Sequence, residues 1–186
     1  MSRRRQIVWE WVDEPGVEHL VLDLGPDGVV ADSLVVGEVR GARFRVRYRI
    51  ACDPRWRFRD ATIAVDGGAS PKSIAIARDA AGAWAVDGVA RPDLTACTDI
   101  DVMVTPFTNT LPIRNRRWRP DMPQRFSVVY VRLPDLAVAS AAQEYTRLAP
   151  RRFRYRGLDP GFTAEIDVDR DGIVTDYAAI WRRRAG

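Results

Sequence analysis

The sequence predicts a mainly β protein (α+β at most), built as a strongly curved antiparallel sheet or incomplete barrel with one or two short helices. The first indication is residues 43–50, which alternate Arg with Phe, Val, Tyr and Ile, so that a strand would carry its apolar side chains on one face. The second is the set of turn signals, such as Pro26-Asp27-Gly28 and Asp171-Gly172, that separate many short β-rich runs. Closely spaced short strands favour a sheet that curves or closes.

The expected elements follow one another along the whole chain. Further β-rich runs cover residues 19–24, 34–39, 55–59, 61–65, 73–77, 126–133, 153–155, 162–168 and 172–177. The segment 137–148 is predicted to be helical, because Ser140 and Gln143 fit a capping box and good helix formers follow.

The length of 186 residues and an apolar fraction of 46% favour one packed domain over residues 1–186, and no linker-like tract interrupts it. No apolar run is long enough for a transmembrane helix or a signal peptide, so we expect a cytoplasmic protein without stable membrane insertion. Cys52 and Cys97 are expected to be free thiols.

The net charge of +4 depends on the two chain ends, because Arg3–Arg5 and Arg182–Arg184 carry six positive charges. Arg and aromatic residues interleave at 43–59 and 151–156, as in some RNA-binding surfaces. A strand would place them on opposite faces, whereas a stacking platform needs both on one face. We therefore expect no nucleic-acid partner. A module that binds RNA or another polyanion through the outer Arg residues is a third possible function, after the two given at the end of this section.

Signals for metal binding and catalysis are weak. Asp167, Asp169 and Asp171 before Gly172 begin like a calcium loop, but the twelfth position is Ala178 instead of Glu, and a hairpin turn explains the pattern. The single histidine, His19, follows Glu18 and could act as a general base, but no nucleophile motif accompanies it. We expect no metal and no cofactor.

The segment from Cys97 to Arg114 differs in composition from the strand-like runs in the rest of the chain. Alternation places Asp99, Asp101 and Met103 on one face of a strand, and a polar stretch bounded by prolines follows. Thr105–Arg114 is therefore predicted as a rigid polar loop, whose Arg114 could pair with Asp99 or Asp101. A ligand site and a structural plug of the sheet are both consistent with this composition.

This segment also carries a family resemblance. Thr105-Pro-Phe-Thr-Asn-Thr-Leu-Pro-Ile-Arg114, with Cys97-x-Asp99-Ile-Asp101 before it, resembles the bacterial family described as putative glycolipid-binding proteins, formerly a domain of unknown function. Further matches run from Gly16-Val-Glu18-His19 to Asp176-Tyr177-x-x-x-Trp181. The resemblance implies a curved antiparallel sheet similar to the lipoprotein carriers, with an apolar concavity that binds glycolipid.

We therefore predict a non-enzymatic protein that binds an amphipathic ligand, a glycolipid or related lipid, in the concavity of a curved sheet. The predicted loop forms the rim of this cavity. The candidate ligand-binding residues are Asp99, Asp101, Thr105, Phe107, Asn109, Arg114, Trp56 and Tyr177. The alternative is an enzyme that acts on a small polar or lipidic substrate through Asp99, Asp101 and His19.

Overall fold

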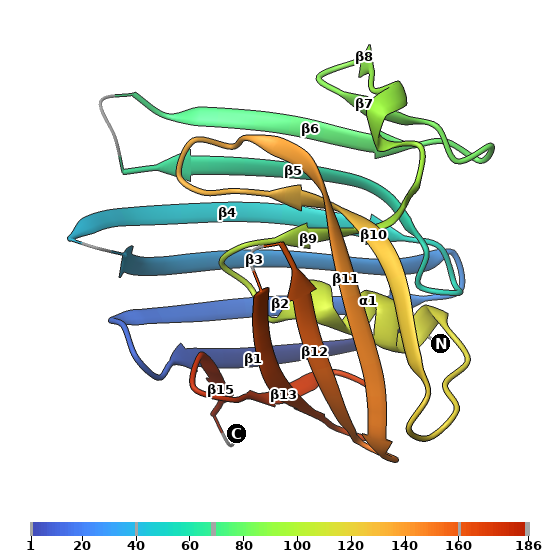
Figure 1. The fold of residues 1–186 in the computed structure, drawn as a ribbon. Coiled ribbons are helices and arrows are strands. Elements are labelled where there is room, and N and C mark those ends of the chain that lie inside the picture. Colours follow the sequence, from blue (N-terminus) through green and yellow to red (C-terminus); the bar gives the residue numbers. More distant parts are fainter. Residues whose placement is uncertain (1, 40, 68–69, 160, 185–186) are drawn as a thin grey trace.

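The computed structural model describes residues 2–39, 41–67, 70–159 and 161–184. Its strands form a 15-stranded sheet in the order β8-β7-β6-β5-β4-β3-β2-β1-β15-β14-β13-β12-β11-β10-β9 (Figure 1). Neighbouring strands are antiparallel, except for the parallel pair β9–β10. The sheet is open, with β8 and β9 at its edges, which confirms the predicted curved antiparallel architecture.

The first part of the chain supplies six long strands, two short ones and a 3-10 helix. They are β1 (Arg3–Trp11), β2 (Gly16–Gly25), β3 (Gly28–Val39), β4 (Ala42–Cys52), β5 (Phe58–Asp66), β6 (Lys72–Arg78), β7 (Trp84–Val86), β8 (Val89–Ala90) and η1 (Pro92–Leu94).

The second part supplies one α-helix and seven strands. They are β9 (Cys97–Val102), α1 (Phe107–Asn115), β10 (Pro123–Val131), β11 (Val138–Ala149), β12 (Arg152–Leu158), β13 (Gly161–Val168), β14 (Val174–Tyr177) and β15 (Trp181–Arg183).

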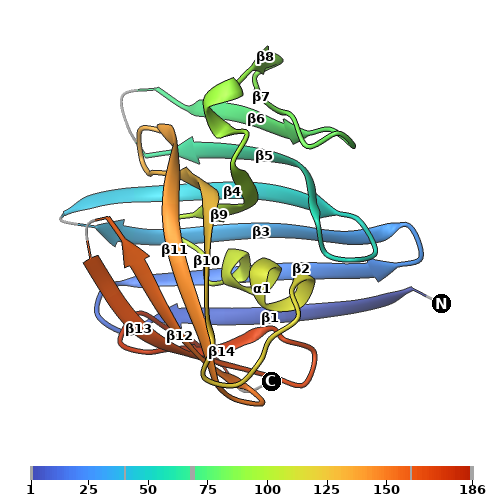
Figure 2. The same ribbon diagram turned by 45° about the vertical axis from the view of Figure 1, so that its right-hand side comes forward.

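The sheet folds back on itself around α1. Strands β1–β6 run across the molecule, β10–β13 cross them at a steep angle, and α1 lies between the two halves (Figures 1 and 2). The edge strand β9 returns to contact β5, and α1 contacts β9 and β14. The concave side of the sheet is therefore largely filled by α1.

The alternating sequence pattern explains which side chains face α1. In β4, Val46, Tyr48 and Ile50 are buried, whereas the intervening Arg side chains are exposed. The outer Arg residues pair with acids on neighbouring strands, as in the contacts of Arg43 with Glu38 (3.1 Å) and Arg45 with Asp66 (2.6 Å). The predicted division into an apolar inner face and a charged outer face is confirmed.

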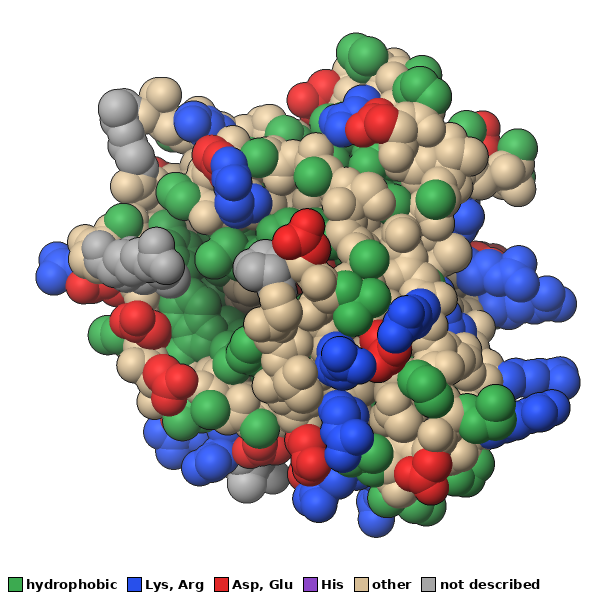
Figure 3. Space-filling view, in the orientation of Figure 1, with side chains coloured by type: hydrophobic (Ala, Val, Ile, Leu, Met, Phe, Trp, Pro, Cys, Tyr) green, Lys and Arg blue, Asp and Glu red, His purple; other side chains and the backbone are tan. Residues whose placement is uncertain are grey.

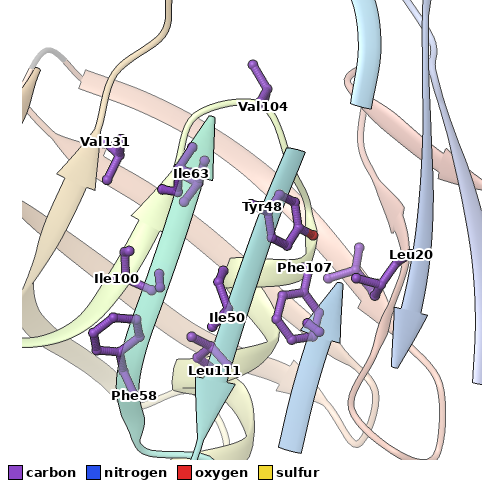
Figure 4. Packing of buried hydrophobic residues seen from close by; sticks show 14 of the residues in the cluster. Leu20, Tyr48, Ile50, Phe58, Ile63, Ile100, Val104, Phe107, Leu111 and Val131 are labelled. Carbon is purple, nitrogen blue, oxygen red and sulfur yellow. The ribbon is translucent and has the colours of Figure 1, made fainter. Parts of the chain in front are cut away.

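The core lies where β4, β5, β9 and α1 meet. Figure 4 shows Ile50 and Ile63 of the sheet, Ile100 of β9, and Phe107 and Leu111 of α1 packed together. All five side chains are fully buried or nearly so. Helix α1 is thus an integral part of the core, because its apolar side chains remove the inner face of the sheet from water.

The predicted helix at 137–148 is wrong, because this segment is strand β11. Its backbone pairs with β10 on one side and with β12 on the other. Glu144 forms ion pairs across both neighbours, with Arg125 (2.7 Å) and Arg156 (2.9 Å). These tertiary contacts override a helix propensity that amounts to less than about 1 kcal/mol per residue.

The predicted loop Thr105–Arg114 is also wrong, because most of it is helix α1. Thr105 provides the start: its hydroxyl oxygen accepts the backbone N–H of Phe107 at 3.0 Å, and Pro106 has the φ angle of −76° that a first helical turn needs. Pro112 lies inside the helix, where proline normally disfavours helical structure. Burial of Phe107, Leu111 and Ile113 offsets this cost.

Two smaller expectations are confirmed. Cys52 and Cys97 are free and buried. The sequence Asp171-Gly172 forms the turn between β13 and β14, with Gly172 at φ +77°. Across the described ranges, no helix is both long and apolar enough to cross a membrane.

We predict that Leu111→Ala lowers the free energy of unfolding by about 2–5 kcal/mol, because it leaves a cavity between α1 and the sheet. Val89→Ala is the control: Val89 is 66% exposed, and its truncation should change stability by less than about 0.5 kcal/mol. Urea unfolding monitored by Trp fluorescence measures both. Equal, small effects would show that α1 is not part of the core.

Candidate functional site

A pocket of about 370 Å³ opens beside the N-terminal end of α1. We call it the aromatic pocket. Asp101 of β9, Thr105 and Asn109 line it on the helix side, and Gln143, Tyr155 and Tyr177 line it on the sheet side. It therefore combines several polar side chains with aromatic rings, as small-molecule sites commonly do.

The aromatic wall is built by three neighbouring strands. Tyr155 of β12 lies 5.9 Å from Tyr177 of β14 and 6.1 Å from Phe162 of β13, measured between ring centroids. Tyr155 and Tyr177 are nearly buried, whereas Phe162 is 44% exposed. The Tyr155 ring meets the Phe162 and Tyr177 rings at angles of 53° and 74°, so the wall presents both ring edges and ring faces to a ligand, and Phe162 is accessible from solvent.

The polar wall is held by hydrogen bonds. Asp101 accepts one from the Thr108 hydroxyl (3.0 Å) and one from Gln143 Nε2 (2.6 Å). Burial raises the pKa of Asp101 above its usual range, although both of these bonds act in the opposite direction. Asn109 Oδ1 accepts the hydroxyl of Tyr145 at 2.7 Å. The carboxyl and amide groups are thus oriented before any ligand arrives.

Behind the pocket lies a buried network centred on Glu18, which is fully buried in β2. Its Oε1 accepts hydrogen bonds from the hydroxyls of Tyr48 (2.5 Å), Ser33 (2.8 Å) and Thr105 (2.9 Å). Its Oε2 is buried and has no partner among the described atoms. Burial raises the pKa of Glu18 from 4.5 to about 7, despite the three hydrogen bonds that favour the ionised form.

Thr105 connects this network to the pocket, because it lines the pocket and binds Glu18. Glu18 is not among the ligand-binding residues predicted from the sequence. The alternation of β2 could have predicted that Glu18 is buried, because Glu18 shares the inward face with Leu20 and Leu22, which are both fully buried. A carboxyl on an apolar strand face indicates a buried polar network.

A second cavity, the apolar groove, adjoins the aromatic pocket. It measures about 590 Å³ and is lined by Phe44, Val65, Met103, Val104 and Leu133. Figure 3 shows it as a hollow with apolar walls, near the ends of β4 and β5 and the β10–β11 connection (left). Met103 lines both cavities, so that the groove and the pocket lie on either side of this residue.

Basic side chains also line the apolar groove. They are Arg43, Lys72 and Arg132, of which Arg43 pairs with Glu38 and Arg132 pairs with Asp135.

The structure brings together four of the eight predicted ligand-binding residues. Asp101, Thr105, Asn109 and Tyr177 all line the aromatic pocket. Their place differs from the predicted rim loop, because Asn109 lies in α1, Thr105 lies just before it, and both side chains are buried.

The other four lie elsewhere. Phe107 is in the core, where its ring stacks on Tyr48. Asp99 is fully buried and pairs with Arg116 (2.8 Å). Trp56 and Arg114 line a separate pocket of about 240 Å³, where the Arg114 guanidinium lies 5.1 Å from the Trp56 ring. Neither Asp99 nor Asp101 pairs with Arg114 among the described contacts, so the pairing considered from the sequence does not form.

His19 lies on the outer face of β2, where its ring contacts Gln6 at 3.2 Å. The fold therefore does not gather His19, Asp99 and Asp101 into one cleft, as the enzymatic alternative requires. The calcium-like sequence is also used structurally: Asp169 and Asp171 pair with Arg5, and Asp167 pairs with Arg152. No group of three His, Cys, Asp or Glu residues suited to a metal ion occurs in the part of the chain that is described.

We predict that Glu18→Gln weakens the pH dependence of stability. In the wild type, the unfolded carboxyl ionises near pH 4.5, whereas the folded one stays protonated to about pH 7. Glu18 therefore makes a contribution to stability of about 3 kcal/mol that is fully present below pH 4.5 and is lost as the pH rises from 4.5 to 7. A glutamine keeps the acceptor for the three hydroxyls and cannot ionise, so this loss should disappear.

Thermal unfolding at pH 5 and pH 8 measures the effect. Glu14→Gln is the control, because Glu14 is exposed and its replacement should leave the wild-type pH dependence intact. An unchanged pH dependence in Glu18→Gln would show that Glu18 is ionised in the folded protein.

Known proteins are similar to this chain in fold and in sequence. The profile of the family described as "Putative glycolipid-binding" matches residues 6–183. A crystal structure of a DUF1089 family protein from Pseudomonas aeruginosa is similar over 90% of this chain and 92% of that chain, with 31% identity and a TM-score of 0.81. No curated protein sequence matches the chain. The match over nearly the whole sequence shows that the chain belongs to the putative glycolipid-binding family.

Proposed function

We propose that the protein binds an amphipathic ligand, a glycolipid or a related glycosylated lipid, without chemical conversion. The sugar headgroup occupies the aromatic pocket, and the alkyl chain occupies the apolar groove. The observation that carries this proposal is that Met103 lines both cavities, which places a polar aromatic compartment beside an apolar one. The family description points to the same ligand class.

The aromatic pocket offers the chemistry that a sugar ring requires. Sugars present hydroxyls on their edges and C–H groups on their faces. Asp101, Gln143 and Asn109 provide acceptors and donors for the hydroxyls, and the rings of Tyr155, Phe162 and Tyr177 suit the apolar faces. Because these polar groups are already fixed by hydrogen bonds, little side-chain entropy is lost on binding.

The apolar groove offers a different environment. Its volume of about 590 Å³ accommodates an alkyl chain, and its walls come from the ends of β4 and β5 and from the β10–β11 connection. Transfer of each methylene group from water to such a surface contributes up to about 0.8 kcal/mol. Lys72 beside the groove can donate a hydrogen bond to the oxygen of an ester group near the chain.

Alkyl glycosides below their micelle-forming concentration are suitable probes. Isothermal titration calorimetry should detect binding of octyl β-D-glucoside and decyl β-D-maltoside. Free maltose and a decyl phosphocholine should bind at least tenfold more weakly than decyl maltoside. Equal affinity for the maltoside and the phosphocholine would contradict a sugar-specific headgroup site. Native mass spectrometry of protein purified from its own host should show co-purified glycolipid.

Incubation of the protein with decyl maltoside separates binding from catalysis. Mass spectrometry of the decyl maltoside after overnight incubation should recover it intact. Release of sugar or decanol would support an enzyme and contradict non-enzymatic binding.

We predict that Phe162→Ala lowers the affinity for decyl maltoside about tenfold and leaves the melting temperature nearly unchanged. The ring is 44% exposed, so its removal costs the fold little but removes one face of the headgroup pocket. The control is Met122→Ala, which truncates a side chain that is 53% exposed and lies outside the described lining of both cavities. Loss of affinity in both variants, or in neither, contradicts the proposed position of the sugar.

We predict that Met103→Glu abolishes the gain of affinity with chain length. In the wild type, each added methylene from octyl to decyl maltoside should raise affinity by ~2–4-fold. A carboxylate at the junction of the two cavities would hold water there and oppose entry of the chain. Met122→Glu introduces the same charge elsewhere and should keep the wild-type slope; an unchanged slope in Met103→Glu would place the chain outside the groove.

A further inference from the structure

A fourth cavity lies at the opposite end of α1 from the aromatic pocket. It measures about 920 Å³, and we call it the arginine cleft. Its walls are the β4–β5 connection, the β6–β7 turn, the start of β9 and the C-terminal end of α1, which lie at the same edge of the molecule (Figures 1 and 2). None of the described residues that line it also lines the aromatic pocket or the apolar groove.

Four arginines, Arg57, Arg59, Arg78 and Arg116, line this cleft. Arg116 pairs with the buried Asp99 at 2.8 Å. Within the described part of the chain, the other three have no carboxylate partner, although arginines on the outer face of the sheet commonly pair with acids. The cleft thus holds a local excess of guanidinium groups.

The acids of the cleft are already engaged. Asp53 Oδ1 accepts the backbone N–H groups of Arg55 (2.8 Å) and Arg57 (2.9 Å), and Asp79 Oδ1 accepts that of Ala83 (2.8 Å). Asp99 binds Arg116 and Asn115. These carboxylates shape the turns and the helix end, and therefore leave the cationic side chains available to a ligand.

Two of the arginines are held in place by protein contacts. The Arg116 guanidinium lies 3.8 Å from the Phe126 ring centroid and donates to the Asn115 side chain at 2.8 Å. The Arg78 guanidinium lies over the Trp84 ring, at 5.4 Å, and donates to the Thr98 carbonyl at 3.3 Å. Arg78 Nε is buried and has no hydrogen-bond partner among the described atoms.

We propose that the arginine cleft is a second binding site, which takes a small molecule carrying a phosphate group. Guanidinium groups donate paired hydrogen bonds that match phosphate oxygens, and prior orientation reduces the entropy lost on binding. The lining holds four arginines against three aspartates, and a bound phosphate can accept hydrogen bonds from the arginines that have no carboxylate partner in the described part of the chain. The volume of the cleft leaves room for an organic group of sugar size beside the phosphate.

This proposal does not rest on the glycolipid function, because the two sites share no described lining residue. Isothermal titration of the full chain at physiological salt tests it, with inorganic phosphate, glucose 6-phosphate and glucose as probes. We expect both phosphates to bind and glucose not to bind. Tighter binding of glucose 6-phosphate identifies an organic phosphate as the ligand, whereas equal binding identifies free phosphate.

The decisive variant is Arg57→Ala/Arg59→Ala, which removes two exposed cationic side chains and should reduce phosphate affinity at least tenfold. The matched control is Arg47→Ala/Arg154→Ala, which removes the same charge from the outer face of β4 and β12 and should change affinity less than twofold. Absence of phosphate binding in the wild type, or equal losses in both double variants, would overturn the proposal. Binding of an RNA oligonucleotide without binding of either small phosphate would also overturn it.

Discussion

The burial of a polar helix inside a curved sheet is the constraint on which the rest of the structure depends. Helix α1 carries Thr and Asn side chains into the core, and such groups are costly to bury unless they are hydrogen-bonded. The sheet meets this requirement from different strands: Asp101 of β9 binds Thr108, Tyr145 of β11 binds Asn109, and Asp99 of β9 binds Asn115. The Thr110 hydroxyl is an exception, since it is buried without a partner among the described atoms. Together with its apolar side chains, these bonds fix the helix across the concavity.

The cavities follow from this arrangement. Because α1 fills the centre of the concave side, space remains mainly at its two ends, and the ends differ in chemistry. The N-terminal end meets the tyrosines of β12 and β14 and the apolar groove, whereas the C-terminal end meets the arginines of the β4–β5 and β6–β7 connections. Asp101 and Asp99, two residues apart on one face of β9, contact opposite ends of the helix. A single strand thus contributes a carboxylate to each of two chemically distinct cavities.

Much of the fold was predictable from the sequence, because strand alternation is a local signal. Arg43–Ile50 shows this well: the pattern alone indicates which side chains face inward. Segments governed by distant partners were not predictable. Val138–Ala149 resembles a helix until β10 and β12 pair with it, and α1 contains proline and β-branched residues that disfavour a helix outside a buried setting. The composition of residues 99–109 drew attention to Asp101, Thr105 and Asn109, which line the aromatic pocket. The sequence could not show that Trp56 and Arg114 lie apart from these three residues, because only the path of α1 places them at its C-terminal end.

A crystal structure of the protein with decyl maltoside tests the central claim most directly, namely that the N-terminal end of α1 holds a sugar headgroup beside an alkyl chain. We predict that the sugar rings lie against Tyr155, Phe162 and Tyr177 within hydrogen-bond distance of Asp101, and that the decyl chain passes Met103 into the groove toward Phe44. A maltoside bound with its chain among the tyrosines, or bound in the arginine cleft, would contradict the account.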